Sequence, residues 1–181
     1  METGCEPPRI VAGMPMYNEE ETIGTVVTMA LRHVDEVICI DDGSSDSSAR
    51  IAEACGATVI RHRGNQGYGA ALKTLFKTMR SNDADVLVVL DSDGQHDTSD
   101  IPKLIQPILD EEADFTIGSR FIEGGEGNDM PAYRRLGIKV ITAASNLTSD
   151  LGIKDTQSGF RAFSRKAIDR LRFDADGMEL S

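Results

Sequence analysis

The 181-residue sequence lacks tryptophan, has only three cysteines and contains no apolar run long enough to cross a membrane. A membrane-spanning helix needs about 18 or more apolar residues in succession. Cys5, Cys39 and Cys55 cannot all pair with one another and none forms a CxxC pair. A disulfide framework or a structural zinc site is therefore not expected. The few cysteines instead indicate a location in the reducing cytoplasm. The acidic N-terminus also lacks the apolar stretch of a signal peptide.

Basic residues are scarce, with 19 Lys and Arg against 30 Asp and Glu, which gives a net charge of −11. A general nucleic-acid-binding protein needs a basic face, so no nucleic-acid partner is expected. The same surplus argues against broad adhesion to anionic lipid. The hydrophobic fraction of 40% is ordinary for a globular protein, and the length fits a single domain over residues 1–181.

Short apolar runs alternate with longer helical patterns along the chain. The expected strands are Ile10–Met14, Glu36–Ile40, Thr58–Arg61, Val86–Leu90 and Phe115–Gly118. The expected helices are Glu20–Arg32, Ser47–Ala54, Gly69–Met79, Pro102–Glu111 and Tyr133–Leu147. This alternation predicts an α/β fold with a mostly parallel central sheet. Further on, Glu123–Asp129 is expected to be a loop, Thr156–Phe163 a strand and Arg165–Leu171 a short basic helix.

Unusual polar segments follow four of the expected strands. They are Pro15–Glu19, Asp41–Asp46, Arg61–Gly69 and Asp91–Asp97. Since the carboxyl ends of parallel strands meet at one edge of a sheet, these segments are expected to form a ligand site there.

Asp91 and Asp93 are the sharpest feature of that edge. In an extended segment, residues i and i+2 point the same way, so the two carboxylates would repel unless a cation lay between them. Oxygen ligands favour Mg²⁺ or Mn²⁺ over zinc, and Gln95 and His96 are possible further ligands. The alternative is an Asp-rich turn with a helix cap.

Two other strand ends could contact a nucleotide. Asp42 could accept hydrogen bonds from a nucleobase N–H or a ribose hydroxyl, although an Asx turn explains it as well. The backbone N–H groups of Gly64–Gly69 could face an anion. Their spacing is not GxGxxG, so a dinucleotide-dependent oxidoreductase is not favoured.

Several arginines could bind phosphate. Arg120 could clamp a diphosphate, or form a surface ion pair. A basic cluster follows near the C-terminus, which is either a solvated helix face or a site for an anionic acceptor or membrane edge. Its members are Arg161, Arg165, Lys166, Arg170 and Arg172.

Taken together, the motifs resemble glycosyltransferase family 2, whose inverting enzymes have a single Rossmann-like nucleotide-sugar-binding domain of the GT-A type. Asp91–His96 and Ser158–Arg161 look most like the dolichyl-phosphate mannose or glucose synthase branch. The segments that carry the resemblance, in family order, are Pro15–Glu19, Asp41–Ser44, Gly64–Gly67, Asp91–Asp93, Gly118–Arg120 and Asp155–Arg161.

The resemblance implies a role for each matching residue. It places Pro15, Tyr17, Glu19, Asp42, Gly67, Asp91, Gln157 and Ser158 in nucleotide-sugar binding. It places Asp91, Asp93 and Gln95 on Mg²⁺ or Mn²⁺, and Arg134 and Arg161 on the acceptor. Asp93, Arg120, Asp155 and Glu179 are the implied catalytic residues, with Glu179 or Asp155 as the base if the acceptor is a hydroxyl.

The resemblance also implies the reaction, which is transfer of one sugar from a UDP- or GDP-linked donor with inversion. The acceptor would be a polyprenyl or dolichyl phosphate, reached by peripheral contact at the inner face of the membrane, or else a glycan hydroxyl. The Gln-x-x-Arg-Trp segment of processive members is missing, and the catalytic domain is expected to lack its C-terminal end. One alternative is a nucleotide-sugar-binding module without catalysis. A phosphatase of the haloacid-dehalogenase type is less favoured, because that family places Asp-x-Asp-Gly after its first strand.

Overall fold

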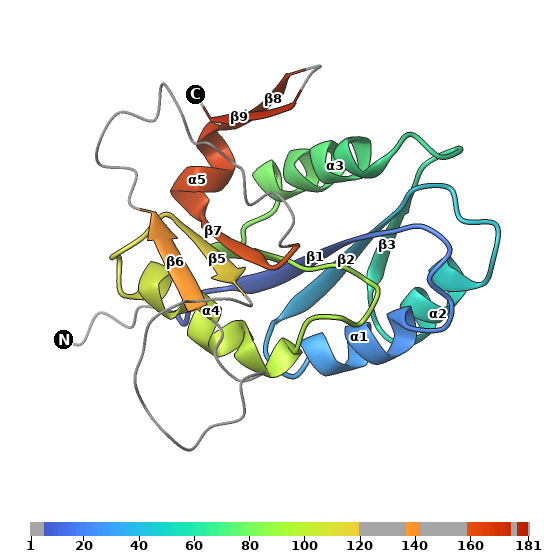
Figure 1. Ribbon diagram of the computed structural model, residues 1–181, viewed down its shortest axis with the longest axis horizontal. Helices are drawn as coiled ribbons and strands as arrows, with labels where there is room; N and C mark the ends of the chain where they lie inside the picture. Colours follow the sequence, from blue (N-terminus) through green and yellow to red (C-terminus); the bar gives the residue numbers. More distant parts are fainter. Residues whose placement is uncertain (1–5, 120–136, 142–158, 175–176, 181) are drawn as a thin grey trace.

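The computed structural model describes residues 6–119, 137–141, 159–174 and 177–180, and it places a seven-stranded sheet between two layers of helices (Figure 1). The strand order is β3-β2-β1-β4-β7-β5-β6. In chain order the strands are β1 Ile10–Met16, β2 Glu36–Asp41, β3 Thr58–Arg61, β4 Val86–Val89, β5 Phe115–Ser119, β6 Gly137–Ile141 and β7 Arg161–Ser164.

The first five strands run in one direction, which confirms the expected α/β fold. β1 pairs in parallel with β2 and β4, and β2 pairs in parallel with β3. β5 does not pair with β4, because β7 lies between them and is antiparallel to both. The Cα atom of Arg161 is thereby in register with Val89 on one side and Ile117 on the other.

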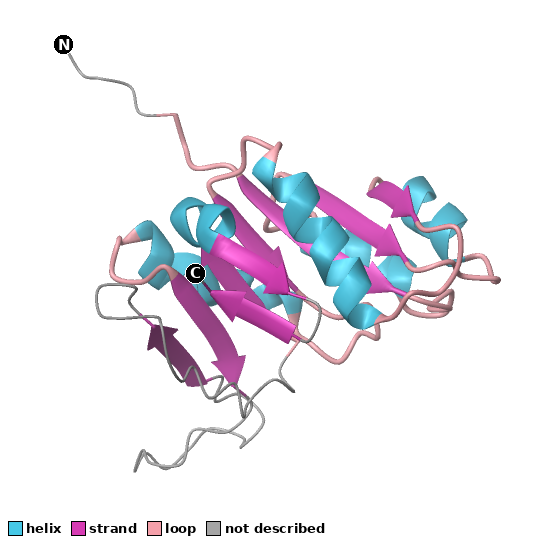
Figure 2. Cartoon of the chain, turned by 90° about the horizontal axis from the view of Figure 1, so that it is seen from above, coloured by secondary structure: helices cyan, strands magenta, loops and turns pink. Residues whose placement is uncertain are grey.

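Helices cover both faces of the sheet (Figure 2). α1 (Ile23–Ala30), α2 (Ser48–Ala54) and α4 (Ile101–Leu109) pack on one face, where α4 follows a short 3-10 turn. α3 (Tyr68–Arg80) and α5 (Arg165–Arg170) pack on the other face. Among the described residues, no helix is both long and apolar enough to cross a bilayer.

α3 lies close against β1. Leu72, Leu75, Phe76 and Met79 form its buried stripe, at the spacing of an amphipathic helix. A Cβ atom on Gly13 of β1 would overlap the side chain of Leu75. Glycine at position 13 therefore allows α3 to pack directly over the centre of the sheet.

The expected elements up to Phe115–Gly118 are confirmed with small shifts at their ends, but one later helix is wrong. Tyr133–Leu147 was expected to be helical, whereas its described part, Gly137–Ile141, is the edge strand β6, antiparallel to β5. The β-branched and apolar residues of this segment suit a strand that completes the hydrogen bonding of β5. β8 (Leu171–Asp174) and β9 (Gly177–Leu180) form an antiparallel hairpin that the sequence pattern did not predict. The expected loop at Glu123–Asp129 lies outside the described residues. Of the strand expected over Thr156–Phe163, residues 156–158 lie outside the described part of the chain and β7 begins at Arg161.

Candidate functional site

A cavity of about 310 Å³ opens at the carboxyl ends of β1, β2, β3 and β4. The chain moves outward from β1 to β2 and β3, and then returns to place β4 on the other side of β1. Ligands of open α/β sheets bind at such a change of direction, because the loops there leave a crevice. The cavity is lined by Pro15, Met16, Tyr17, Glu19, Asp42, Asn65, Gly67, Tyr68, Ala71, Asp91, Ser92 and Asp93.

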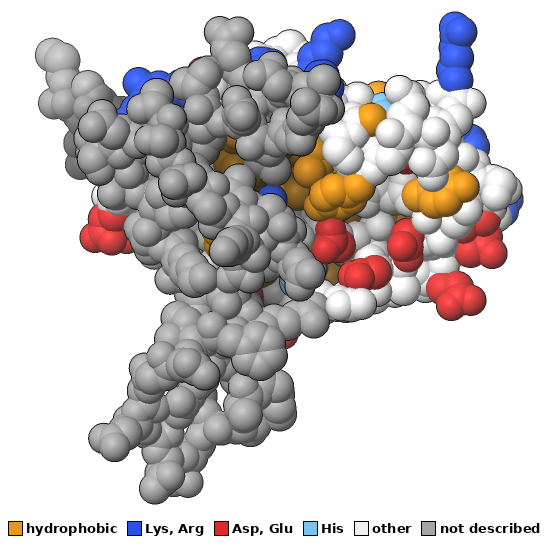
Figure 3. Space-filling view, turned by 45° about the horizontal axis from the view of Figure 1, so that its top comes forward, with side chains coloured by type: hydrophobic (Ala, Val, Ile, Leu, Met, Phe, Trp, Pro, Cys, Tyr) orange, Lys and Arg blue, Asp and Glu red, His pale blue; other side chains and the backbone are white. Residues whose placement is uncertain are grey.

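The cavity joins the four polar segments expected at this edge, and seven predicted site residues line it: Pro15, Tyr17, Glu19, Asp42, Gly67, Asp91 and Asp93. Tyr17 and Tyr68 are unusually exposed for aromatic side chains, at 46% and 50%. Figure 3 shows exposed hydrophobic side chains beside a row of acidic ones on one face. The walls thus offer rings that could contact a nucleobase and carboxylates that could hold a cation.

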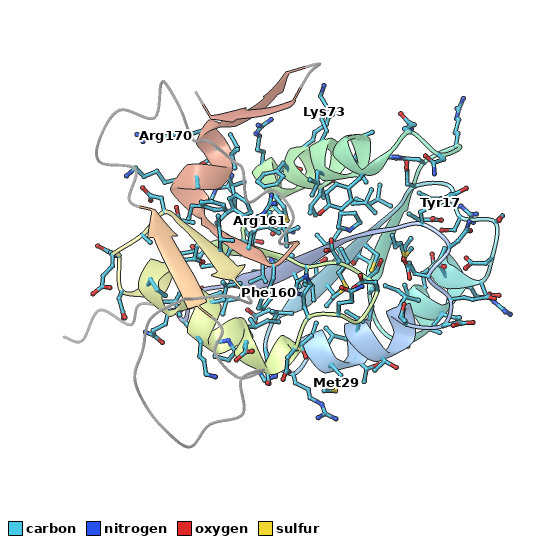
Figure 4. All side chains as sticks on the ribbon, viewed as in Figure 1. Tyr17, Met29, Lys73, Phe160, Arg161 and Arg170 are labelled. Carbon is cyan, nitrogen blue, oxygen red and sulfur yellow. The ribbon has the colours of Figure 1, made fainter. Side chains whose placement is uncertain are left out.

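The loop after β1 is fastened to the loop after β2. The backbone N–H of Asn18 donates to Ser44 Oγ at 3.0 Å, and Asn18 Oδ1 accepts from the N–H of Ser45 at 2.8 Å. The N–H of Glu19 donates to Ser48 Oγ at 2.7 Å. These bonds hold the backbone on both sides of the cavity mouth, so the loop that carries Tyr17 (Figure 4) is built in advance of any ligand.

Asp42 organises the glycine-rich loop. Its Oδ2 accepts from the N–H of Gly67 at 2.7 Å, and its Oδ1 accepts from the N–H of Gln66 at 3.0 Å. His62 Nδ1 lies 2.7 Å from Asp42 Oδ1, and His62 Nε2 lies 2.8 Å from Thr74 Oγ1. Burial alone would raise the pKa of Asp42, but these hydrogen bonds outweigh it and hold the pKa below the usual value.

The anion that the Gly64–Gly69 loop faces is therefore the protein's own carboxylate. Gly67 has φ of +91°, a conformation that suits glycine. Asp42 retains little acceptor capacity beyond its intramolecular partners, since a carboxylate offers about four acceptor positions. Its contact with a nucleoside stays a prediction.

Asp41, which the sequence analysis gave no role, is a buried anchor for the same region. Its Oδ1 accepts from the N–H of Ser44 at 2.8 Å, and its Oδ2 lies 3.0 Å from Arg61 Nε. The neighbouring Gly43 has φ of +80°, and a Cβ atom there would lie 2.6 Å from the backbone of Gly64. The two glycine-containing motifs therefore meet through their backbones, which explains why position 43 needs glycine.

Asp91 has several partners within the cavity. Tyr68 donates its hydroxyl to Asp91 Oδ1 at 3.2 Å, and His96 Nε2 lies 3.5 Å from Asp91 Oδ2. The pKa of Asp91 lies below its usual value, chiefly because of the hydrogen bond from His96. Burial acts in the opposite direction. The charge of His96, the hydrogen bond from Tyr68 and the charge of Arg161 lower the pKa further. The pKa of Tyr68 is raised to about 12 by the partial burial of this half-exposed side chain and by the charge of Asp91.

The segment Asp91–Asp93 is a turn rather than the extended chain that the spacing argument assumed. Ser92 is buried and donates its hydroxyl to the carbonyl of Pro15 at 3.0 Å, which ties the turn to the end of β1. Asp93 Oδ1 accepts from the N–H of Gln95 at 2.9 Å. The expected extended conformation is therefore wrong, yet Asp91 and Asp93 both line the cavity.

Within the described residues, no three His, Cys, Asp or Glu side chains gather as a complete metal site. Mg²⁺ and Mn²⁺, however, are often held by one or two carboxylates together with substrate phosphate oxygens. Asp91 and Asp93 on one cavity wall fit that arrangement. Gln95 is exposed and does not line the cavity, so its role as a third ligand stays a prediction.

β7 brings residues from late in the chain to Asp91. The ring of Phe160 stacks on His96 with centroids 5.3 Å apart, and Arg161 is buried (Figure 4). A Cβ atom on Gly159 would overlap the Asp91 carboxylate. The positive charge of Arg161 acts on Asp91, a wall of the cavity, although Arg161 does not itself line the cavity. Its contact with the acceptor stays a prediction.

Two further members of the basic cluster, Arg165 and Lys166, have local partners. Arg165 donates to the carbonyls of Met79 and Asn82 and pairs with Asp169, and Lys166 lies 3.1 Å from Asp114. These contacts give Arg165 a structural role, since it donates to carbonyl groups at the C-terminal end of α3.

The remaining predicted site residues, Arg120, Arg134, Asp155, Gln157 and Ser158, lie outside the described part of the chain. Glu179 lies in β9, of which only the backbone is described. Asn65 and Tyr68 also line the cavity, although their side chains were not predicted as site residues; both fall within the glycine-rich segment Gly64–Gly69.

Comparison with known proteins gives a consistent result. The model of the family described as Glycosyl transferase family 2 matches residues 12–172. The chain is 34% identical over 171 residues to an uncharacterized protein of Methanocaldococcus jannaschii, covering 93% of this chain and 70% of that protein. It is 33% identical over 173 residues to a UDP-N-acetylglucosamine–dolichyl-phosphate N-acetylglucosaminyltransferase of Methanococcus voltae, covering 86% and 69%.

A solved structure is similar as well. Glucosyl-3-phosphoglycerate synthase from Mycobacterium tuberculosis, in complex with Mn²⁺, UDP-glucose and phosphoglyceric acid, superposes with a TM-score of 0.63 at 30% identity. The match covers 92% of this chain and 60% of that one. This chain therefore spans only part of each of these proteins.

Proposed function

Because this chain belongs to glycosyl transferase family 2, we propose that it transfers a single sugar from a nucleotide-diphosphate sugar to a polyprenyl or dolichyl phosphate, with inversion at the anomeric carbon. The observation that carries the proposal is the cavity itself. It joins two exposed tyrosines, suited to a nucleobase, to Asp91 and Asp93, suited to a diphosphate-bound cation.

The donor would lie across the ends of β1 and β4. Tyr17 and Glu19 would contact the nucleoside, while Asp42 would hold the loop that closes that end of the cavity. UDP and GDP donors both remain candidates. The M. voltae relative is named for a UDP-linked donor, which makes UDP-N-acetylglucosamine the first to test.

Departure of the nucleoside diphosphate requires that its negative charge be neutralised. Asp91 and Asp93 would hold Mg²⁺ or Mn²⁺, which when bound acts as a Lewis acid on the phosphate oxygens. Arg120 would add positive charge, as the family resemblance implies. The buried Arg161 lies in the strand beside this region and supports a site for a second anion.

A lipid phosphate is the proposed acceptor because named relatives act on dolichyl phosphate. Such an acceptor is already an anion at neutral pH and needs no general base. A hydroxyl acceptor is the second candidate, since the solved relative was crystallised with phosphoglyceric acid. A hydroxyl would need a base, for which Asp155 and Glu179 are the proposed residues.

The proposal is tested first by binding. Nucleotide-sugars are screened by thermal shift with Mn²⁺ and with a chelator, and a selective donor should raise the melting temperature only with the ion. Asp93→Ala should abolish that metal-dependent shift and keep the fold. Asp110→Ala, which removes an exposed carboxylate just after the end of α4, is the matched control and should bind as the wild type does. Wild-type donor binding by Asp93→Ala would contradict the metal role.

Transfer is then tested with the donor that binds. Polyprenyl phosphate and phosphoglyceric acid are offered in parallel, and the linkage of the product shows whether the anomeric configuration is inverted. Donor binding without transfer to any acceptor would favour a binding module. Release of inorganic phosphate from simple phosphoesters would instead favour a phosphatase.

A further inference from the structure

Residues 54–82 form the longest stretch of this acidic chain without an acidic residue. They include Arg61, Arg63, Lys73, Lys77 and Arg80 and contain no Asp or Glu, although the whole chain has 30 acidic residues. Most of this stretch consists of α3 and the loop that leads into it. The donor site uses the start of the helix, since Tyr68 and Ala71 line the cavity, but it does not use these positive charges.

The basic residues of α3 lie on its solvent side. Lys73, Lys77 and Arg80 follow one another at intervals of four and three, which places them on one face of a helix. All three are exposed, and the opposite stripe is buried against the sheet. Lys73 points away from the sheet in Figure 4, on the same side of the molecule as the labelled Arg170 of α5.

Lys73 and Lys77 have no acidic partner in the described part of the chain. On the other side of the sheet, by contrast, Lys103 of α4 is neutralised by Asp100 at 2.9 Å. Like charges at i and i+4 repel each other on a helix, so the α3 pair is unfavourable in isolation. Figure 3 shows several Lys and Arg side chains along the upper rim of the molecule, above the row of acidic side chains.

We propose that the solvent face of α3, defined by Lys73, Lys77 and Arg80, together with the exposed Arg63 of the loop that leads into the helix, is the surface by which this protein contacts an anionic membrane. The net charge of −11 makes the other faces repel such a membrane, so the basic face also sets the orientation. Because α3 begins at the cavity, this orientation brings the donor site close to the lipid headgroups. The choice of a membrane over other polyanions rests on the proposed lipid-phosphate acceptor.

The attraction is local and electrostatic. Each Lys or Arg near an anionic bilayer strengthens binding roughly fivefold, and the effect decays within a Debye length of about 10 Å at 0.1 M salt. A few such charges give reversible binding that weakens with salt.

The test is co-sedimentation of this chain with vesicles of pure phosphatidylcholine, and of phosphatidylcholine mixed with phosphatidylglycerol, at low and high salt. Binding is expected only with the anionic vesicles and should fall as salt rises. Lys73→Gln with Lys77→Gln should weaken it at least tenfold. Arg32→Gln with Arg50→Gln, which removes two exposed charges from the side of α1 and α2, is the matched control and should bind as the wild type does.

An equal loss in both double variants, or no loss in the lysine variant, would overturn the assignment of the surface. Binding to single-stranded RNA but not to anionic vesicles would replace the membrane with a different polyanion. The failure of the proposed function is seen separately, in transfer to polyprenyl phosphate dispersed in detergent. There the lysine variant should react as the wild type does, and absence of transfer by both proteins would contradict the acceptor but not the surface.

Discussion

Gly159 lies against the carboxylate of Asp91 so closely that position 159 has no room for a side chain. The two residues are far apart in sequence and meet because β7 inserts beside β4. The carboxylate is thus confined between Gly159 on one side and the hydroxyl of Tyr68 and the ring of His96 on others. The position of the Asp91 carboxylate therefore depends on the pairing of β7 with β4.

Gly159→Ala should therefore displace the Asp91 carboxylate without unfolding the protein. We expect donor binding to weaken by about tenfold or more, a change of about 1.4 kcal/mol, measured by titration calorimetry with Mn²⁺ present. Gly69→Ala is the matched control, because a Cβ atom there meets nothing within 4 Å. That variant should bind normally and gain up to about 1 kcal/mol of stability from a better helix former. Equal donor affinities for the two variants would contradict the role of Gly159.

Gly43→Ala should destabilise the protein more than Gly56→Ala, although both replace a glycine at positive φ. Gly43 and Gly56 have φ of +80° and +99°, but only Gly43 approaches backbone closely, at 2.6 Å from Gly64. An alanine held at positive φ costs about 1–2 kcal/mol, so Gly43→Ala and Gly56→Ala should both lower the free energy of unfolding by that amount. The contact with Gly64 should add about 1–3 kcal/mol at position 43 alone. Urea denaturation measures both, and equal losses would show that the two loops can separate without cost.

Asp42→Asn should lower stability at neutral pH more than in acid. The pKa of Asp42 is held below its usual value, so the ionised carboxylate stabilises the folded state above the usual aspartate range. That contribution is lost as the pH falls through the lowered pKa. The difference in free energy of unfolding between wild type and variant should be about 1–3 kcal/mol at pH 7 and should shrink below about pH 4.

Urea denaturation from pH 7 to pH 3 gives this comparison. Asp110→Asn, at the exposed residue that follows α4, serves as a control and should differ from wild type by less than about 0.5 kcal/mol throughout. A wild-type advantage over Asp42→Asn that grows in acid would have the wrong sign for a carboxylate with a lowered pKa.

Tyr68 should ionise only in strong alkali. Its pKa is raised to about 12 by the burial of the covered half of its side chain and by the charge of Asp91. In a variant that carries Tyr17→Phe and Tyr133→Phe, the remaining tyrosine is Tyr68, and its phenolate can be followed by ultraviolet absorbance. Adding Asp91→Asn should lower the midpoint, because a negative neighbour is removed. An unchanged midpoint, with circular dichroism showing a folded protein, would place the tyrosine away from Asp91.

The family expected from the motifs, and with it the glycosyltransferase class, is confirmed by the match over residues 12–172 and by the named relatives. Those relatives also agree with the dolichyl-phosphate branch. The strands up to Phe115–Ser119 were predictable because each is a local apolar run with a local helix after it. The polar residues after Met16, Asp41 and Val89 were therefore predictable as one site.

Other features needed partners that no local pattern reveals. The same residues 137–141 suit a helix or a strand, and the free edge of β5 decided for the strand. The place of Arg161 between Val89 and Ile117 likewise follows from the order of strands in the sheet. A pattern of apolar residues shows which segments are buried, but not which segment they are buried against.

By itself, the sequence determined the alternation of strands and helices and the chemistry of the edge where the strands end, because both follow from the spacing of side chains along a short stretch of chain. Only the tertiary structure decided that the glycine-rich loop donates to Asp42, that Gly159 confines Asp91, and that Lys73 and Lys77 face solvent without an acidic partner among the described residues. Those relationships join residues by distance and direction in space, which depend on how the whole sheet is assembled.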